Sequence, residues 1–281
     1  MNATIWIAIG ALVLFGLADV VYKRAALSGV PAHQLLMVQT WIFLPIIFTY
    51  AFATGTVKID VAALWGLAAG AFAYTGFYNF AASLKGGAIS VNAPIFRLSF
   101  CVTAVLAITL LGEPVTAFKL AGLGLALLAV WLLLGGATGP ARPSAASLTR
   151  VLLATAFLGL GNFLYKVGVG AGASPATLLV AQVLVVVPAS TLVCASIDGA
   201  VRPVAATWRF APWAALLLAG AFILLVEALA RGQASIVVPI AQMGFVITAA
   251  FGFLVLDERF TARKGIGLVL AVAALASLAH G

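Results

Sequence analysis

Charged residues are scarce in this sequence. Asp, Glu, Lys and Arg make up 8% of the 281 residues, 64% are hydrophobic, and mean hydropathy is +1.21. Roughly a quarter of a soluble domain is charged, so a water-facing surface cannot be built here and a soluble globular protein is excluded. At about 20 residues per membrane-spanning helix, the chain has room for roughly ten spans with short connections and no extramembrane domain.

Sequence patterns for nucleotide, metal or catalytic chemistry are lacking as well. The sequence contains no HExxH, CxxC, P-loop, GxGxxG or acidic metal-binding loop. Cys101 and Cys194 lie inside apolar runs and are interpreted as small core residues. His33 and His280 lie at the ends of apolar runs without a ligand pattern. We therefore predict no cofactor, no metal and no catalytic residue, which disfavours an ATP-driven pump or a metalloenzyme.

Acidic residues are few, 7 against 15 Lys and Arg, so the net charge is +8. In a soluble protein this balance would indicate nucleic-acid binding. Here the basic residues stand singly or in pairs at the ends of apolar runs, where lipid head groups and the insertion machinery place them. We expect the lipid bilayer, not nucleic acid, as the partner. The first run, residues 5–18, lacks a signal-peptide pattern and is expected to stay as a span.

The apolar runs predict an all-α integral membrane protein of ten transmembrane helices. The helices are expected near residues 4–26, 33–53, 62–84, 90–111, 117–135, 149–169, 176–197, 210–230, 236–256 and 263–280. The longest connection, 135–150, is rich in Gly, Pro, Ala and Ser and lies at the middle of the chain. The predicted domains are therefore a first five-helix repeat (1–136), a linker (137–148) and a second five-helix repeat (149–281).

The two five-helix units are copies of each other. GEPVTAFKLAG at 112–122 returns as DERFTARKGIG at 257–267. This pairs Glu113, Thr116, Lys119 and Gly122 with Glu258, Thr261, Lys264 and Gly267. Upstream, the matched pairs are Tyr22 with Tyr165, Lys23 with Lys166, Gln39 with Gln182, Pro45 with Pro188, and Pro94 with Pro239. Because each unit has an odd number of helices, the copies must be inverted in the membrane, which is the usual basis of alternating access.

These features resemble the drug/metabolite transporter superfamily in its EamA-like ten-helix branch. The resemblance rests on ten helices in two halves, with the GE…T…K..G pattern after the fourth and ninth spans, and it extends over essentially the whole chain. The sequence is similar to bacterial amino acid exporters, those for aromatic amino acids among them. The resemblance implies a secondary transporter of small metabolites, often an exporter, in the cell inner membrane. It also implies a cavity lined by the first four helices of each half, with the fifth packed outside.

The repeated motif is predicted to be structural. Its polar side chains recur every third residue, as on one face of a helix start. Thr116 can cap the following helix, the acidic residue would lie near its positive end, and Glu113 and Lys119 can pair across the turn. A pinned hairpin at the bilayer surface is therefore favoured over carboxylate chemistry. Pro94 and Pro239 are expected to bend helices four and nine or to lie in their first turns.

Polar positions that differ between the halves are the candidates for substrate contact. Arg97 lies about seven residues inside helix four, where the other half has Gln242, and an unpaired guanidinium in hydrocarbon costs several kcal/mol. Its partner is expected to be Glu227 on helix eight, as a tie between helices, or a substrate carboxylate, with Gln242 near the site. Glu227 is also placed to pair with Arg231 one turn on.

Helix three supplies an aromatic candidate surface. Tyr74 and Tyr78 are one turn apart and Asn79 is adjacent, whereas the matching stretch of helix eight is apolar. Their depth favours a cavity wall over an interfacial aromatic belt. Trp41 on helix two is a further cavity candidate. Gln39 and Gln182 are expected to be buried amides bonding between helices.

Charges near the ends of helices one and six form a further set of candidates. Asp19 and Lys23 are an i,i+4 pair, mirrored by Asn162 and Lys166. Both lysines lie close enough to the interface to reach the head groups. We expect Asp19, Lys23 and Lys166 either to anchor the helices at the interface or to form a charged gate to the cavity.

The favoured function is a carrier of amino acids or similar small metabolites, working by alternating access without an obligate protein partner. Arg97 would meet the substrate carboxylate, and Glu227 or the tyrosines the amine. A coupled proton would be carried by Glu227 or Asp19, although facilitated diffusion fits equally well. The alternative is a carrier of hydrophobic or quaternary-ammonium cations, with Glu227 and the aromatic face forming a cation–π site. A membrane-embedded enzyme or assembly factor would need a catalytic cluster that the sequence lacks.

Orientation is the point on which charge and resemblance conflict. Ten Lys and Arg residues lie on the odd-numbered connections and four on the even-numbered ones, and Arg97 completes the 15. The positive-inside tendency then puts both termini outside, whereas the resemblance implies both inside. We expect both termini on the same side and leave the side open.

Overall fold

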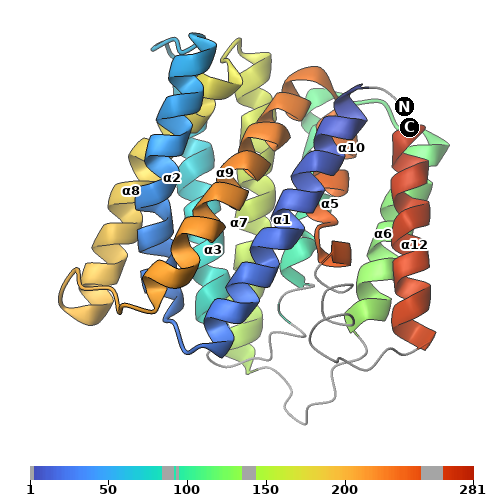
Figure 1. Ribbon diagram of the computed structural model, residues 1–281. Coiled ribbons are helices and arrows are strands. Elements are labelled where there is room, and N and C mark those ends of the chain that lie inside the picture. Colours follow the sequence, from blue (N-terminus) through green and yellow to red (C-terminus); the bar gives the residue numbers. More distant parts are fainter. Residues whose placement is uncertain (1–2, 84–91, 93–94, 135–143, 248–261) are drawn as a thin grey trace.

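The fold was analysed in a computed structural model that describes residues 3–83, 92, 95–134, 144–247 and 262–281. Ten helices and no strand occur within these ranges (Figure 1). The helices are α1 (Ala3–Leu27), α2 (Ala32–Thr54), α3 (Ala63–Ser83), α5 (Ser99–Leu111), α6 (Ala117–Leu134), α7 (Ala145–Gly170), α8 (Pro175–Asp198), α9 (Thr207–Arg231), α10 (Ala234–Gln242) and α12 (Ala262–Ala279). The predicted all-helical class is confirmed.

The helices have the length and surface of a membrane protein. Among the described residues, α1, α2, α7, α8 and α9 are long and apolar enough to cross a membrane by length and composition, and shorter apolar helices accompany them. Large apolar side chains such as Trp6, Phe52, Trp131 and Val269 are exposed on the outside of the bundle. Such a surface suits lipid, where every backbone polar group must be satisfied within a helix.

The two repeats are interlaced. Helices α1, α2, α3, α5 and α6 of the first half correspond to α7, α8, α9, α10 and α12 of the second. The contact of α1 with α9 is matched by that of α3 with α7, α2–α9 is matched by α3–α8, and α1–α10 is matched by α5–α7. The contacts α2–α8, α5–α10 and α6–α12 each join a helix to its own counterpart. This is the packing of an inverted repeat about a two-fold pseudo-axis.

Close helix approaches repeat with the same symmetry. A Cβ on Gly16 would lie 2.5 Å from the carbonyl oxygen of Gly244, and a Cβ on Gly159 would lie 2.6 Å from that of Ser99. Gly16 and Gly159 occupy matched positions in α1 and α7, as do Ser99 at the start of α5 and Gly244 two residues after the end of α10. Small residues at these crossings let the backbones touch, as is usual between helices in membranes.

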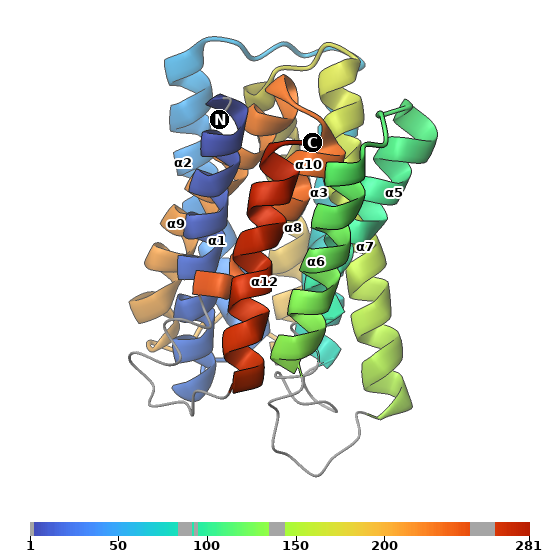
Figure 2. The same ribbon diagram turned by 90° about the vertical axis from the view of Figure 1, so that its right-hand side faces the viewer.

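Both chain ends lie at the same end of the bundle (Figure 1). A Cβ on Gly232 would meet the side chain of Thr4, and a Cβ on Gly281 would meet Thr116 and Lys119. The two chain ends therefore border two turns that the hydrogen bond from Lys119 to Gln233 joins. The turned view shows α6 and α12 side by side along one flank of the bundle (Figure 2). The fifth helix of each half therefore packs on its counterpart at the periphery.

Candidate functional site

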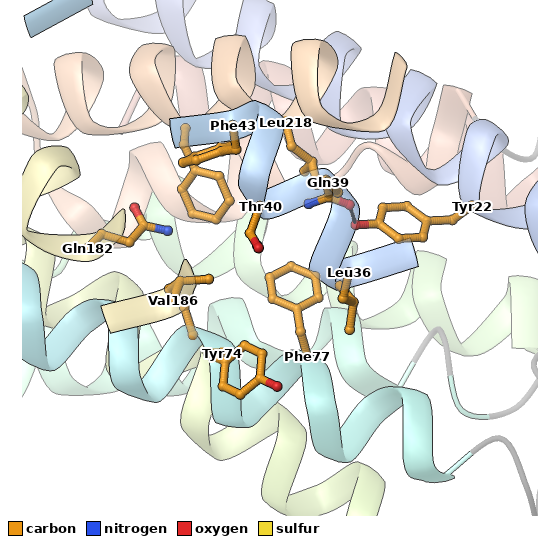
Figure 3. A pocket seen from close by; sticks show the side chains of 12 residues that line it. Tyr22, Leu36, Gln39, Thr40, Phe43, Tyr74, Phe77, Gln182, Val186 and Leu218 are labelled. Carbon is orange, nitrogen blue, oxygen red and sulfur yellow. Dashed lines mark hydrogen bonds between the residues drawn. The ribbon is translucent and has the colours of Figure 1, made fainter. Parts of the chain in front are cut away.

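A cavity lies inside the bundle, between the two halves (Figure 3). Helices α1, α2 and α3 of the first half and α8 and α9 of the second line it. The lining residues are Tyr22, Leu36, Gln39, Thr40, Phe43, Ala73, Tyr74, Phe77, Gln182, Val186, Leu218 and Phe222. The cavity encloses about 40 Å³, room for a few waters at roughly 10–15 Å³ each. Ligand sites usually enclose about 300–1,000 Å³, so the cavity in this structure is smaller than a typical ligand site.

The cavity lies deep within the bundle. Phe43, a lining residue of the candidate span α2, is 11 residues from the start of the helix at Ala32 and 11 from its end at Thr54. At about 1.5 Å per residue, each separation corresponds to roughly 16 Å. Both are close to half of the roughly 30 Å hydrocarbon thickness of a bilayer. The cavity is therefore near the midplane, where inverted-repeat carriers hold their substrates.

The polar groups of the lining are two amides and three hydroxyls, its apolar part is aromatic and aliphatic, and none of the described lining residues is charged. The matched residues Gln39 and Gln182 come from opposite halves. The Tyr22 hydroxyl donates to Gln39 Oε1. In the other half, the buried Gln182 Oε1 and Tyr165 hydroxyl have no hydrogen-bond partner within the described part of the chain. The Tyr22–Gln39 pair is therefore hydrogen-bonded, whereas its counterpart in the other half leaves two buried polar atoms unsatisfied among the described residues. Each such atom costs about 1–3 kcal/mol.

Arg97 is held by a different carboxylate from the one that the sequence suggested. Its guanidinium forms an ion pair with Asp19 on α1 and donates from Nη1 to Gln242 Oε1 over 3.0 Å. The side chains of Arg97 and Asp19 are 12% and 30% exposed. Asp19 is three residues before Tyr22 on α1, so the ion pair lies within one helical turn of a cavity residue. The sequence could not distinguish Asp19 from Glu227, because both are single acidic residues inside apolar helices.

Glu227 belongs to a separate cluster. It accepts from the Tyr50 hydroxyl over 2.6 Å and pairs with Arg231 over 2.8 Å. The pairing of Glu227 with Arg231 at i,i+4 is as the spacing predicted. Tyr50 was not anticipated, because nothing in its local sequence marks it. Neither Glu227 nor Arg231 is among the described residues that line the cavity.

The aromatic candidates divide between the cavity and its surroundings. Tyr74 lines the cavity, and the lining continues along α3 through Phe77 rather than Tyr78. Asn79 donates to the carbonyl of Thr75 in its own helix over 2.9 Å. Trp41, Tyr78 and Asn79 are outside the described lining, and Trp41 donates to Thr191 over 2.9 Å. Their proposed contact with substrate stays a prediction.

The repeated hinge motif joins the two halves to each other. Glu113 accepts from the backbone N–H groups of Ala234 (2.6 Å) and Ser235 (2.9 Å), and from the Ser235 hydroxyl. It therefore caps α10 of the opposite half. Thr116 does cap the following helix, accepting from the N–H of Lys119 over 3.1 Å.

The two lysines near this hinge bind the same connection between α9 and α10. The Lys119 ammonium donates to the Pro114 carbonyl and to Gln233 Oε1, each over 2.5 Å, in place of the expected pair with Glu113. Lys166 donates to the carbonyls of Leu229 (3.0 Å) and Gly232 (2.6 Å) at the end of α9. A cation at a helix C-terminus is favourable, so Lys166 acts as a cap in this state.

The remaining motif residues are placed as follows. Gly122 lies against α12, where an added Cβ would be 2.6 Å from Leu278 Cγ. Gly267 is buried in α12, Pro239 is buried inside α10, and Lys23 lies near the end of α1. Pro94, Glu258, Thr261 and the side chain of Lys264 lie outside the described residues.

Sequence reasoning missed several residues of the cavity. Tyr22, Phe43, Phe77 and Phe222 were not singled out, and the paired glutamines were interpreted only as interhelical contacts. A usable signal was present for one set. Tyr and Gln recur together in both repeats, at 22 and 39 and again at 165 and 182. Two polar residues at the same positions of apolar helices in both repeats predict an internal site that the two halves share.

Comparison with known proteins identifies the family. The pattern of the EamA-like transporter family matches residues 2–135 and again residues 146–279. The chain belongs to the EamA-like transporter family. Both matches together span nearly the whole chain, as an internal duplication requires. Proteins of this family are membrane transporters of small molecules, which accounts for a midplane cavity between inverted halves.

Structural comparison agrees with this fold. A solved structure described only as a crystal structure of a protein superposes with a TM-score of 0.82 at 16% sequence identity. The match covers 98% of this chain and 96% of that chain. No curated protein matches the sequence.

Proposed function

We propose that this EamA-like transporter carries amino acids, as an exporter of the cell inner membrane, by alternating access through the central cavity. The observation that supports this most directly is the cavity itself. It lies near the midplane between inverted halves and is lined by amides and aromatic rings, with no charged side chain among its described lining. Such a lining suits a zwitterion of zero net charge whose side chain is apolar or aromatic.

Recognition of the amine is assigned to the second half. Gln182 Oε1 is buried in the cavity wall without a partner in the described chain. An ammonium group of the substrate would donate to it and remove the cost of the unsatisfied acceptor. The rings of Phe43, Tyr74, Phe77 and Phe222 would then surround the substrate side chain.

Recognition of the carboxylate is assigned to Arg97. The guanidinium now binds Asp19, one helical turn from the cavity residue Tyr22. A substrate carboxylate and ionised Asp19 would compete for the same bidentate donor. Protonation of Asp19 releases Arg97, so substrate binding and proton binding go together. This competition supports substrate binding that depends on protonation of Asp19, and not of Glu227.

Alternation between two states is supported by the unequal Tyr–Gln pairs. In this state Tyr22 and Gln39 are bonded, while the equivalent Tyr165 and Gln182 each leave a buried polar atom without a partner in the described chain. In an inverted-repeat carrier, the opposite state exchanges the conformations of the halves. Tyr165 would then donate to Gln182, and the Tyr22–Gln39 bond would open.

One observation favours the alternative, a carrier of hydrophobic or quaternary-ammonium cations. The lining is rich in aromatic rings, which attract cations through their faces. The carboxylate that this alternative requires, Glu227, is bound by Tyr50 and Arg231 and lies outside the described lining. The zwitterion proposal needs no such rearrangement of Glu227.

Transport by the purified protein in liposomes tests the proposal. Radiolabelled amino acids with aliphatic and aromatic side chains, and a labelled quaternary amine, are offered separately. We expect amino acid flux, and Gln182→Ala to weaken substrate affinity by about 10- to 100-fold, the worth of one hydrogen bond to a charged group. Ser196→Ala is the control on the same helix, since its exposed hydroxyl bonds only the Val193 carbonyl. Flux of the quaternary amine alone would contradict the proposal and support the alternative.

A further inference from the structure

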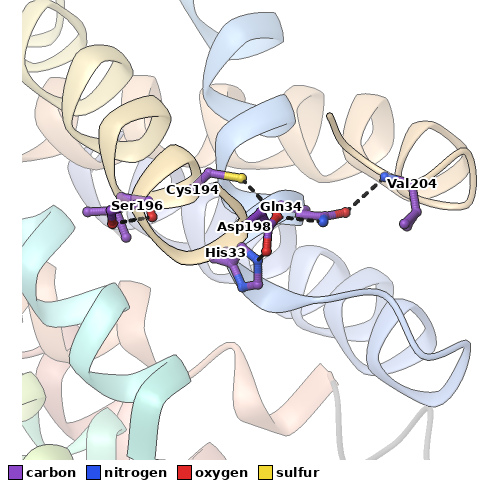
Figure 4. Close-up of polar contacts among 7 residues, drawn as sticks. His33, Gln34, Cys194, Ser196, Asp198 and Val204 are labelled. Carbon is purple, nitrogen blue, oxygen red and sulfur yellow. Dashed lines mark hydrogen bonds and ion pairs between the residues drawn. The ribbon is translucent and has the colours of Figure 1, made fainter. Parts of the chain in front are cut away.

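Three side chains of metal-binding type meet at the end of the bundle away from the chain termini. His33 is in the first turn of α2, and Cys194 and Asp198 are in the last turns of α8 (Figure 4). His33 Nε2 lies 2.8 Å from Asp198 Oδ1, and Cys194 Sγ lies 3.6 Å from Asp198 Oδ2. One ligand atom from each residue can be chosen so that all three lie within 4.8 Å of one another. None of the three lines the central cavity.

The spacing of these atoms fits a tetrahedral ion after small side-chain movements. Zinc bonds of about 2.0–2.3 Å to nitrogen, oxygen and sulfur place neighbouring ligands roughly 3.3–3.8 Å apart. The separation of sulfur from Asp198 Oδ2 is already in this range, and that of nitrogen from Asp198 Oδ1 is about half an ångström short, so a rotation of the carboxylate would bring one of its oxygens to the ion. Cys194 and Asp198 are four residues apart and project from one face of α8, while His33 comes from α2. A water would complete the four ligands.

The carboxylate is also oriented by neighbouring groups, as ligands of metal sites usually are. Gln34 Nε2 donates to Asp198 Oδ2 over 2.7 Å, and Gln34 Oε1 accepts from the N–H of Val204 over 2.9 Å. The amide is thus fixed at both ends and holds Asp198 towards His33 and Cys194 (Figure 4).

Burial and symmetry also favour a site over a simple packing contact. Cys194 is fully buried, whereas the side chains of His33 and Asp198 are 23% and 25% exposed, so an ion could enter from solvent. In the register that pairs Pro45 with Pro188, the counterparts of His33 and Cys194 are Ala176 and Ala51. The scaffold therefore does not require these two side chains at the equivalent place.

We propose that His33, Cys194 and Asp198 bind a divalent transition-metal ion, with Zn²⁺ the best match to a nitrogen, sulfur and oxygen set. On binding, the Cys194 thiol releases its proton to solvent, and the His33 proton moves to Nδ1 so that Nε2 can coordinate. The ion links α2 of the first half to α8 of the second. Its binding does not depend on which substrate the protein carries.

Cobalt binding to the purified full-length protein tests the proposal. Co²⁺ is titrated, the thiolate-to-cobalt charge-transfer band is recorded, and the ion is then displaced with Zn²⁺. We expect one ion per chain with a thiolate band. Cys194→Ser should abolish the band, and His33→Ala and Asp198→Asn should weaken affinity by at least about 100-fold. Gln34→Ala should weaken it by about 10- to 100-fold, the usual effect of removing an orienting group.

Two variants serve as matched controls. Cys101→Ser removes the other cysteine, a half-buried residue of α5, and Ser196→Ala removes a hydroxyl that is two residues from both Cys194 and Asp198. Neither should change cobalt affinity or the band. Absence of the band in the wild-type protein, its persistence in Cys194→Ser, or its loss in Cys101→Ser would each overturn the proposal. Circular dichroism of each variant checks that the helices are retained. If a variant of a ligand residue loses its helices, a second substitution at the same position is tested instead: Cys194→Ala, His33→Gln or Asp198→Ser.

Discussion

At the residue scale, the charged side chains inside the bundle have polar partners from other helices. The guanidinium of Arg97 has Asp19 and Gln242, and Glu227 has Tyr50 and Arg231. The sequence showed that Arg97 needed a partner, because an unpaired guanidinium in hydrocarbon is costly. It could not show which acidic residue, because that choice depends on how the halves interlace.

A double-mutant experiment on Arg97 and Asp19 separates a structural role of their ion pair from a role in substrate binding. Breaking a fully buried pair costs about 3–5 kcal/mol, and less is expected here because Asp19 is 30% exposed. We predict that Asp19→Asn and Arg97→Gln each lower the unfolding free energy, and that the double variant recovers most of the loss. Amino acid flux should stay low in the double variant, because the substrate carboxylate still lacks its donor.

Stability in detergent and flux in liposomes are measured on the same four proteins, the wild type included. Recovery of both stability and flux in the double variant would show that Arg97 only ties helices together. We expect wild-type flux to rise as pH falls, because protonation of Asp19 releases Arg97, and we expect Asp19→Asn to lack this rise, because its side chain no longer takes up a proton.

At the element scale, the repeated hinge has a clear physical reason. Helix α10 begins directly after a two-residue connection, and its first N–H groups would otherwise be unsatisfied within the membrane protein. Glu113 from the opposite half supplies the acceptor. The motif spacing correctly suggested helix capping. It could not reveal that the capped helix belongs to the other repeat, because capping is usually local in sequence.

Removal of this cap should be costly. Hydrogen bonds to a charged group contribute about 1.5–3 kcal/mol each, and helix caps about 0.5–2 kcal/mol. We predict that Glu113→Ala lowers the unfolding free energy by about 2–4 kcal/mol and Ser235→Ala by less, since the serine removes only one of three bonds. Thr109→Ala is the control on α5, because its exposed hydroxyl bonds its own helix. Equal stability of Glu113→Ala and the control would refute the cross-half cap.

The contact between α6 and α12 offers a sharper comparison within one helix. A Cβ at Gly122 would lie 2.6 Å from Leu278 Cγ, whereas a Cβ at Gly124 meets nothing within 4 Å. We predict that Gly122→Ala costs about 1–3 kcal/mol by overpacking. Gly124→Ala should be neutral or stabilising by up to about 1 kcal/mol, since alanine favours the helix. Thermal unfolding measures both, and a larger loss at Gly124 would show that α6 is rotated from its described position.

At the scale of the whole molecule, the duplication determines the architecture. Ten helices, their order and their inverted pairing followed from apolar runs and a repeat with an odd number of spans. The cavity was less predictable. Only Tyr74 among the proposed lining residues is in it in this state, because which side of each helix faces the centre depends on packing between halves.

Orientation is a prediction that belongs to this scale. Both chain ends lie at one end of the bundle (Figure 1), so a tag at either terminus should be accessible from the same side of the membrane. We predict identical protease sensitivity of N- and C-terminal tags in sealed vesicles of either orientation. Opposite sensitivity of the two tags would be incompatible with two inverted five-helix halves.

Accessibility of the cavity from each side of the membrane tests the central claim most directly. Phe43→Cys, in a protein with Cys101 and Cys194 replaced by serine, is labelled with an impermeant thiol reagent from one side and then from the other. We predict labelling from each side, with Tyr22→Phe and Tyr165→Phe shifting the ratio in opposite directions. Labelling from one side alone, or a shift in the same direction for both variants, would contradict two inverted halves that alternate around a shared cavity.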